Sequence, residues 1–141
     1  MTNIEVAKIM VSGMHELADI LICRKFKKGE RILDEGDVCR SMLYLEKGLT
    51  RQFYFKYDKD LTEHIAYEGG VVICLESYLK EEPTRLMIEA LEPTIAWGIP
   101  KDKIEQLALK DAEIGVWYRK LFEASLIESQ VKADTLRFES A

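Results

Sequence analysis

Two neighbouring stretches decide the fold: residues 28–37, which read KGERILDEGD, and residues 42–48, which read MLYLEKG. In the first, two glycine turns enclose a short strand that contains Ile32 and Leu33. In the second, an alternating strand ends in Lys-Gly. Each glycine allows the positive φ that a sharp corner requires. Strands this short and this closely punctuated predict an all-β roll rather than a parallel α/β sheet.

The same pattern extends over residues 21–100, where apolar or alternating runs are separated by turn signals about every 8 to 12 residues. Residues 2–20 have helical spacing and begin with a capping-box pattern. Pro100 can begin a short helix, and Asp111 can cap a longer one. We therefore predict one domain over residues 1–141, with N-terminal helices at 1–20, a β-roll at 21–100 and C-terminal helices at 101–141.

The long C-terminal helix, expected from Asp111 to about Phe138, would measure roughly 40 Å at 1.5 Å per residue. That exceeds the width of a globule of about 110 residues. A second copy of the helix is the simplest cover for its apolar side, so we predict a homodimer. The alternative is that the whole apolar side packs onto its own domain. The predicted interface has a 3–4–3 spacing and consists of Ile114, Trp117, Leu121 and Ala124.

Composition excludes several classes of protein. With 48% hydrophobic and 32% charged residues, the chain is typical of globular domains. No run of about 18 apolar residues predicts a membrane span. No secretory signal is visible, so we expect a cytoplasmic protein with reduced thiols at Cys23, Cys39 and Cys74. The net charge of -5 weighs against a nucleic-acid surface, and we interpret the basic stretch at 24–31 as a solvated strand end and turn.

The order of helix, glycine-punctuated roll and long helix resembles the cyclic-nucleotide-binding domains, most of all the sensor half of the bacterial cyclic AMP receptor and fumarate–nitrate regulator (Crp/Fnr) family. That family places a glycine turn, a hydrophobic pair, a second glycine and then a strand ending in Lys-Gly or Ser-Gly. The resemblance covers nearly the whole chain. It implies a double-stranded β-helix (jelly roll) that senses a ligand, forms a homodimer and regulates transcription.

In family members that bind cyclic AMP, a short helix begins with Gly-Glu, and an Arg-Ser or Arg-Thr pair follows about ten residues later. Aligned without gaps, this chain has Ile73-Cys74 in place of Gly-Glu, and Glu76 stands two places late. Thr84-Arg85 reverses the order of the second pair. A one-residue slip along a strand would turn Arg85 to the other face. These departures weigh against ordinary cyclic AMP binding, because an enclosed phosphate needs a paired cation.

Two interpretations of the pocket stay open. A modified pocket could hold a cyclic nucleotide or another small anion with Glu76, Ser77, Thr84 and Arg85. Alternatively, Glu76 and Arg85 form a surface pair, and the pocket is empty or binds something else. The resemblance also places Ser129 and Gln130 where the family reaches from the long helix to the base; they can equally be solvated helix positions.

Other chemistry finds little support in the sequence. Three scattered cysteines cannot supply the four ligands of an iron–sulphur cluster, and His64 on a strand is a weak haem ligand candidate. His15-Glu16 lacks the second histidine of a zinc-protease helix. A cupin-type enzyme would need more metal ligands than Glu63 and His64. We therefore predict no catalytic residue, no metal site and no enzyme activity.

The resemblance leaves two functional hypotheses. Family members that regulate transcription carry a helix-turn-helix domain after the long helix, and residues 136–141 lie just where that domain would begin. We expect contact with DNA only if such a domain follows in the natural protein. The alternative is a stand-alone module that regulates a protein partner without binding DNA.

Overall fold

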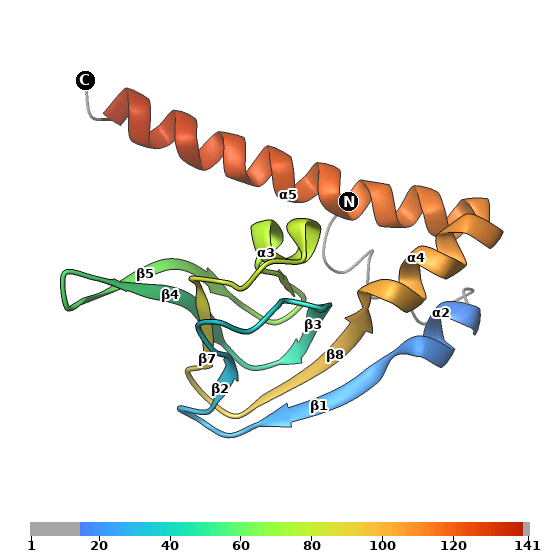
Figure 1. Cartoon of the computed structure of the whole chain (residues 1–141), viewed down its shortest axis with the longest axis horizontal. Coiled ribbons are helices and arrows are strands. Elements are labelled where there is room, and N and C mark those ends of the chain that lie inside the picture. The colour runs from blue at the N-terminus through green and yellow to red at the C-terminus, as the bar shows by residue number, and fades with distance from the viewer. Residues whose placement is uncertain (1–14, 140–141) are drawn as a thin grey trace.

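The computed structural model describes residues 15–139, and it describes the side chains of residues 16–127. Two four-stranded antiparallel sheets face each other, which confirms the predicted jelly roll (Figure 1). In spatial order, one sheet contains β1 (Ile22–Phe26), β8 (Thr94–Pro100), β3 (Ser41–Lys47) and β6 (Val71–Val72). The other contains β2 (Arg31–Leu33), β7 (Met87–Ala90), β4 (Thr50–Lys56) and β5 (Lys59–Ala66).

Four described helices flank the roll: α2 (His15–Ile20), α3 (Leu75–Lys80), α4 (Lys101–Lys110) and α5 (Ala112–Glu139). Pro100 is the N-cap of α4, as its fixed φ favours. The Asp111 carboxylate accepts hydrogen bonds from the N–H groups of Glu113 (2.9 Å) and Ile114 (3.4 Å), which confirms the predicted start of the long helix. The capping-box pattern expected within residues 2–20 lies outside the described residues. None of the described helices is long and apolar enough to cross a membrane.

The corners of the roll confirm the turn predictions. Tyr57 and Asp58 form the two-residue tip between β4 and β5, with φ values of 52° and 63° that match the twist of a hairpin. Gly48 turns the chain from β3 into β4 at a φ of 117°. A Cβ at this position would lie 2.7 Å from the Cα of Thr94, so no larger residue fits there. The β3–β4 corner therefore rests directly on the start of β8.

One continuous core runs from the roll into the C-terminal helices. Leu45 of β3, Ile99 of β8 and Ile104 of α4 are all 1% exposed or less. The first half of α5 contributes further buried side chains to the same core. α5 crosses over α3 on its way along the molecule (Figure 1), so the long helix covers the segment between β6 and β7. That segment contains every predicted ligand residue except the two on α5.

Candidate functional site

The segment between β6 and β7, which we call the cassette, consists of Cys74, the short helix α3 and the loop of residues 81–86. Cys74 is the N-cap of α3 without a side-chain hydrogen bond to the helix. Glu81 ends the helix in the left-handed conformation, at a φ of 56°. The cassette encloses a cavity of about 430 Å³, the cassette cavity. Its lining residues are Cys74, Glu76, Ser77, Glu82, Pro83, Thr84, Arg85 and Leu86.

The structure brings four of the predicted ligand residues, Glu76, Ser77, Thr84 and Arg85, together around this one cavity. Two of them, Ser77 and Thr84, are buried, and their hydroxyl groups are already occupied. Ser77 donates to the carbonyl of Glu82 and accepts from the N–H of Cys39, which lies outside the cassette. Thr84 donates to the carbonyl of Leu86 and accepts from its N–H, both at 3.0 Å. These hydroxyls therefore hold the cassette loop in place.

The charged pair of the cassette differs from the surface pair considered above. Glu76 is exposed and forms its ion pair with Lys80, one helical turn away at 3.1 Å, rather than with Arg85. Arg85 lies in the loop, because β7 begins only at Met87. The argument that a register slip would turn Arg85 away from the cavity is therefore wrong: Arg85 lies outside the strand and lines the cavity. Two carboxylates, of Glu76 and Glu82, share the cavity with this guanidinium.

The remaining two ligand candidates, Ser129 and Gln130, lie on α5 but outside the residues whose side chains are described. A different connection joins the cassette to the long helix. The hydroxyl groups of Tyr78 on α3 and Tyr118 on α5 are 2.6 Å apart. Tyr78 is fully buried, and burial, the first cause, raises its pKa well above the ordinary range, with the Tyr118 hydrogen bond adding to the shift. The ring of Phe122 contacts both tyrosines.

The apolar stripe predicted as the dimer interface faces the chain's own core. Ile114, Trp117 and Leu121 are 1%, 2% and 7% exposed, so these three side chains are not available to a second copy. That part of the prediction is wrong, because a 3–4–3 spacing marks an apolar face without stating which surface covers it. Ala124 is exposed. Among the α5 side chains that the structure describes, the large apolar ones that are exposed are Val116, Leu126 and Ile127.

Two buried thiols lie where the cassette meets the loop between β2 and β3. Cys39, in the loop between β2 and β3, and Cys74 are 4% and 2% exposed, and both are reduced. Their side chains are hydrogen bonded to each other, which lowers the pKa of Cys39 to about 7. The same contact, followed by burial, raises the pKa of Cys74. The pair thus loses one proton readily and resists losing the second. No cluster of three His, Cys, Asp or Glu side chains that could hold a metal ion occurs among the described residues.

A comparison with protein families identifies the domain to which this fold belongs. Residues 23–111 match the family described as the cyclic nucleotide-binding domain. The chain belongs to this family. The match contains the whole cassette and nearly all of the roll, from the second residue of β1 to the residue that caps α5.

Three solved structures of bacterial proteins show the same fold. The catabolite activator protein of Thermus thermophilus is 19% identical, has a TM-score of 0.70 and matches 92% of this chain and 63% of its own. The sensor domain of the transcriptional regulator DNR from Pseudomonas aeruginosa is 10% identical, with a TM-score of 0.68 and coverages of 89% and 91%. A protein from Eubacterium rectale described as a Crp/Fnr-family regulator is 16% identical, with a TM-score of 0.68 and coverages of 91% and 62%.

The chain thus spans less than two thirds of the first and third of these proteins and nearly all of the separate sensor domain. A comparison with curated proteins finds no match. The predicted likeness to the sensor half of Crp/Fnr regulators is confirmed at the level of fold. Neither Tyr78 nor Tyr118 was predicted as a site residue, and Cys39 was predicted only as a reduced thiol. The aromatic residues at 118 and 122 mark a second apolar stripe on α5, which was the one available signal.

Proposed function

We propose that this chain is the effector-sensing and dimerising domain of a cytoplasmic transcription regulator of the Crp/Fnr type, with a regulatory rather than a catalytic role. The hydrogen bond between Tyr78 and Tyr118 is the observation that carries this proposal. It joins the helix that lines the cassette cavity to the long helix, and it lies in a buried aromatic cluster. A change in the cassette therefore acts on α5 directly. Contact with DNA is proposed only for a protein in which a DNA-binding domain follows α5.

The cassette favours an effector other than a cyclic nucleotide. A cyclic phosphate carries a negative charge, and the cavity presents two carboxylates against the single guanidinium of Arg85. The hydroxyls of Ser77 and Thr84 would first have to give up their present hydrogen bonds. Because leaving buried polar groups unpaired costs about 1–3 kcal/mol each, we expect weak or absent binding.

Calorimetric titration with cyclic AMP and with cyclic GMP tests this expectation. We expect no heat of binding at micromolar nucleotide. Arg85→Gln is the matched variant, because it removes the one cation of the cassette cavity and leaves the fold untouched at an exposed site. Micromolar binding by the wild type that is lost in Arg85→Gln would assign the cyclic nucleotide to this cavity and overturn the expectation.

For the dimer, we propose that the exposed apolar face of α5 packs against a second copy. Val116 and Ile127 are 40% and 64% exposed. They are eleven residues apart, close to three helical turns, so they lie on one face. Ala124 lies near the same face and stays in the proposed interface. The buried stripe of the original prediction stays within the domain core.

Sedimentation velocity with Val116→Glu/Ile127→Glu tests this interface. Phe55→Glu is the control, because Phe55 is also an exposed apolar residue, at 55%, but lies on β4. We expect a dimer for the wild type and for the control, and a folded monomer for the double variant. A wild type that sediments as a monomer at micromolar concentration, or a double variant that stays dimeric, would show that α5 does not form the interface.

A further inference from the structure

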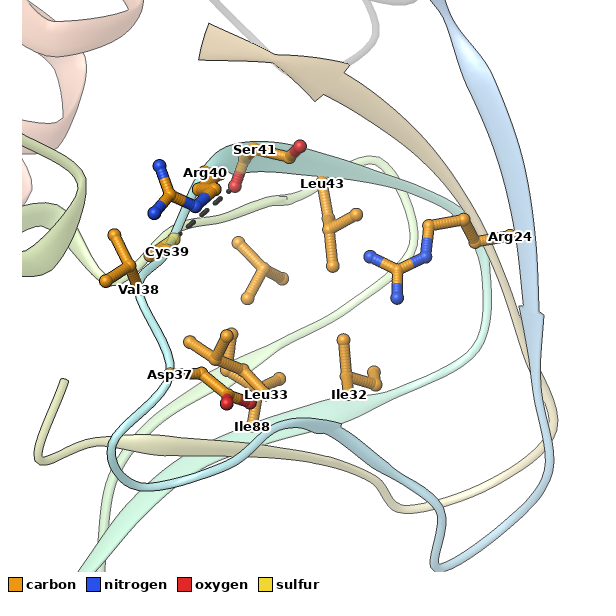
Figure 2. A pocket seen from close by; sticks show the side chains of 11 residues that line it. Arg24, Ile32, Leu33, Asp37, Val38, Cys39, Arg40, Ser41, Leu43 and Ile88 are labelled. Atoms are coloured by element: carbon orange, nitrogen blue, oxygen red, sulfur yellow. Dashed lines mark hydrogen bonds between the residues drawn. The ribbon is translucent and has the colours of Figure 1, made fainter. Parts of the chain in front are cut away.

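A second cavity of about 350 Å³ lies away from the cassette, between the two sheets at the edge where β1 and β2 face each other (Figure 2). We call it the edge cavity. Leu43 and Ile88, which are 4% and 2% exposed, form opposite walls from β3 and β7. Ile32 lies on the β2 side and Arg24 on the β1 side of the opening. Arg40 and Asp37 also belong to the lining, so charged and apolar side chains meet here. Protein cores are normally filled to near-crystal density, so an unfilled space of this size is a candidate binding site.

The inner face of β8 explains why the space is open. β8 presents Thr94, Ala96 and Gly98 at alternate positions, and all three are buried. These side chains are small where a sandwich core usually has large ones. A Cβ added at Gly98 would lie 3.5 Å from the carbonyl oxygen of Ile22 and 3.7 Å from both Arg24 Cδ and Leu43 Cδ2, so a side chain at that position would extend towards two of the residues that line the cavity. The small residues of β8 thus leave room beside Arg24 and Leu43, which line the cavity.

Arg24 supplies charge to this space. It is directly opposite Ala96 in the β1–β8 pairing, and opposite residues point to the same face of a sheet. Ala96 is 0% exposed, whereas Arg24 lies on the edge strand and is exposed, and Figure 2 shows its guanidinium directed toward the cavity. Its one recorded contact with another described side chain is with the ring of Phe26, 5.0 Å from the guanidinium carbon. Arg24 is itself exposed, in agreement with the interpretation of residues 24–31 as solvated, so its charge lies at the solvent-facing rim of the cavity.

We propose that the edge cavity binds a small monocarboxylic acid, with the carboxylate on Arg24 and the apolar body between Leu43 and Ile88. A planar guanidinium binds carboxylates through two parallel hydrogen bonds, and such a pair gains strength where the surroundings exclude water. At about 30 Å³ for each water-sized group, the volume holds roughly a dozen non-hydrogen atoms. That suits an aryl or medium-chain alkyl acid. Asp37 at the opening further disfavours a dianion.

The wall of the edge cavity is also hydrogen bonded to the cassette. The N–H of Gly36 donates to the carbonyl of Thr84 at 2.9 Å, and the N–H of Thr84 donates to the carbonyl of Asp37 at 2.8 Å. The N–H of Cys39 donates to the Ser77 hydroxyl at 2.9 Å. A ligand that moves the β2–β3 loop therefore moves α3. This inference rests on the proposed sensing function and assigns its effector site.

Methyl-labelled NMR of the whole chain tests the site. The probes are benzoate, 3-phenylpropanoate and octanoate, each compared with its neutral amide. We expect the acids to shift the methyl signals of Leu43 and Ile88, with saturation at millimolar concentration or below, and the amides to bind at least tenfold more weakly. Arg24→Gln should lower the affinity for the acids at least tenfold, whereas Arg85→Gln in the cassette should leave it unchanged.

Three results would overturn the site: no shift with any acid, equal shifts with acid and amide, or equal affinity in Arg24→Gln and the wild type. Each of them would indicate that Arg24 only protects the edge strand β1 from pairing with other chains. The Ile114 methyl on α5 separates this outcome from failure of the proposed function. Acids that shift Leu43 and Ile88 but leave Ile114 and the sedimentation of the chain unchanged would confirm the site and contradict sensing through α5.

Discussion

Removing the hydroxyl of Tyr118 should destabilise the protein more than removing that of Tyr78. In Tyr118→Phe, the Tyr78 hydroxyl remains in a side chain that is 0% exposed, and its only recorded hydrogen bond is lost. A buried hydroxyl without a partner costs about 1–3 kcal/mol. In Tyr78→Phe, the half-buried Tyr118 hydroxyl can turn towards water, so only the net value of one hydrogen bond, about 0.5–1.5 kcal/mol, is lost.

The double variant Tyr78→Phe/Tyr118→Phe should be more stable than the sum of the two single variants predicts. Replacing both partners by apolar groups of the same shape is nearly neutral, because no buried donor is left unpaired. The single losses add up to about 3 kcal/mol and the double variant loses almost nothing, so we expect a coupling free energy of about 3 kcal/mol between the two residues. A value of this size would establish that α3 and α5 are held together by this contact.

Urea unfolding followed by tryptophan fluorescence measures these free energies, with all four proteins at one concentration because dimerisation also stabilises the fold. Trp117 is buried and directly precedes Tyr118 on α5, so its fluorescence reports unfolding near this contact. If the two single variants lose equal free energy and the double variant loses their sum, the two hydroxyls act independently. The link from the cassette to the long helix would then be refuted.

Two further perturbations test the corner and the thiol pair. Gly48→Ala should lose about 3 kcal/mol or more of unfolding free energy, since φ is 117° and the new Cβ meets the Thr94 backbone at 2.7 Å. Gly36→Ala, where φ is also positive but the space around the Cβ is open, should lose about 1 kcal/mol. Equal losses of the two variants in thermal unfolding would contradict the predicted clash. The Cys39 pKa is lowered to about 7 by its hydrogen bond to the Cys74 thiol, so its stabilisation is present near pH 9 and lost as the pH falls through 7. Cys39→Ser should flatten the rise in unfolding free energy between these values, and a wild type already flat there would count against the lowered pKa.

The corners and helix starts could be predicted because they depend on local chemistry. Gly29 and Gly48 adopt the positive φ that their turns require, and the Asp111 carboxylate caps a helix through N–H groups within three residues. Such preferences act over a few residues of chain. The order of these elements then leaves few ways to close a roll, which is why the fold followed from the sequence.

The faces of the elements could not be assigned in the same way. The spacing of Ile114, Trp117 and Leu121 identifies one side of a helix, but the choice between its own domain and a second copy depends on what α4 and β8 leave uncovered. Arg24 shares a strand face with Phe26, yet alternation alone does not state which face is inward. Arg85 was assigned to a strand because the loop length after Pro83 is not visible in the sequence.

The altered cassette is best understood as a support that has exchanged its ligand contacts for internal ones. Ser77 accepts the hydrogen bond of Cys39 and donates to the cassette loop, and Thr84 is bonded on both sides of its backbone to the β2–β3 loop. A hydroxyl that fixes two loops has no free donor for a phosphate. Ser77 and Thr84, whose hydroxyls we expect to be unavailable to a nucleotide, are thus also the residues through which the β2–β3 loop is bonded to the cassette. If an acid bound at Arg24 shifts the loop at Cys39, the effect reaches Tyr78 without any ligand in the cassette. A domain that does not bind a cyclic nucleotide in the cassette would then still sense an effector, at the edge cavity.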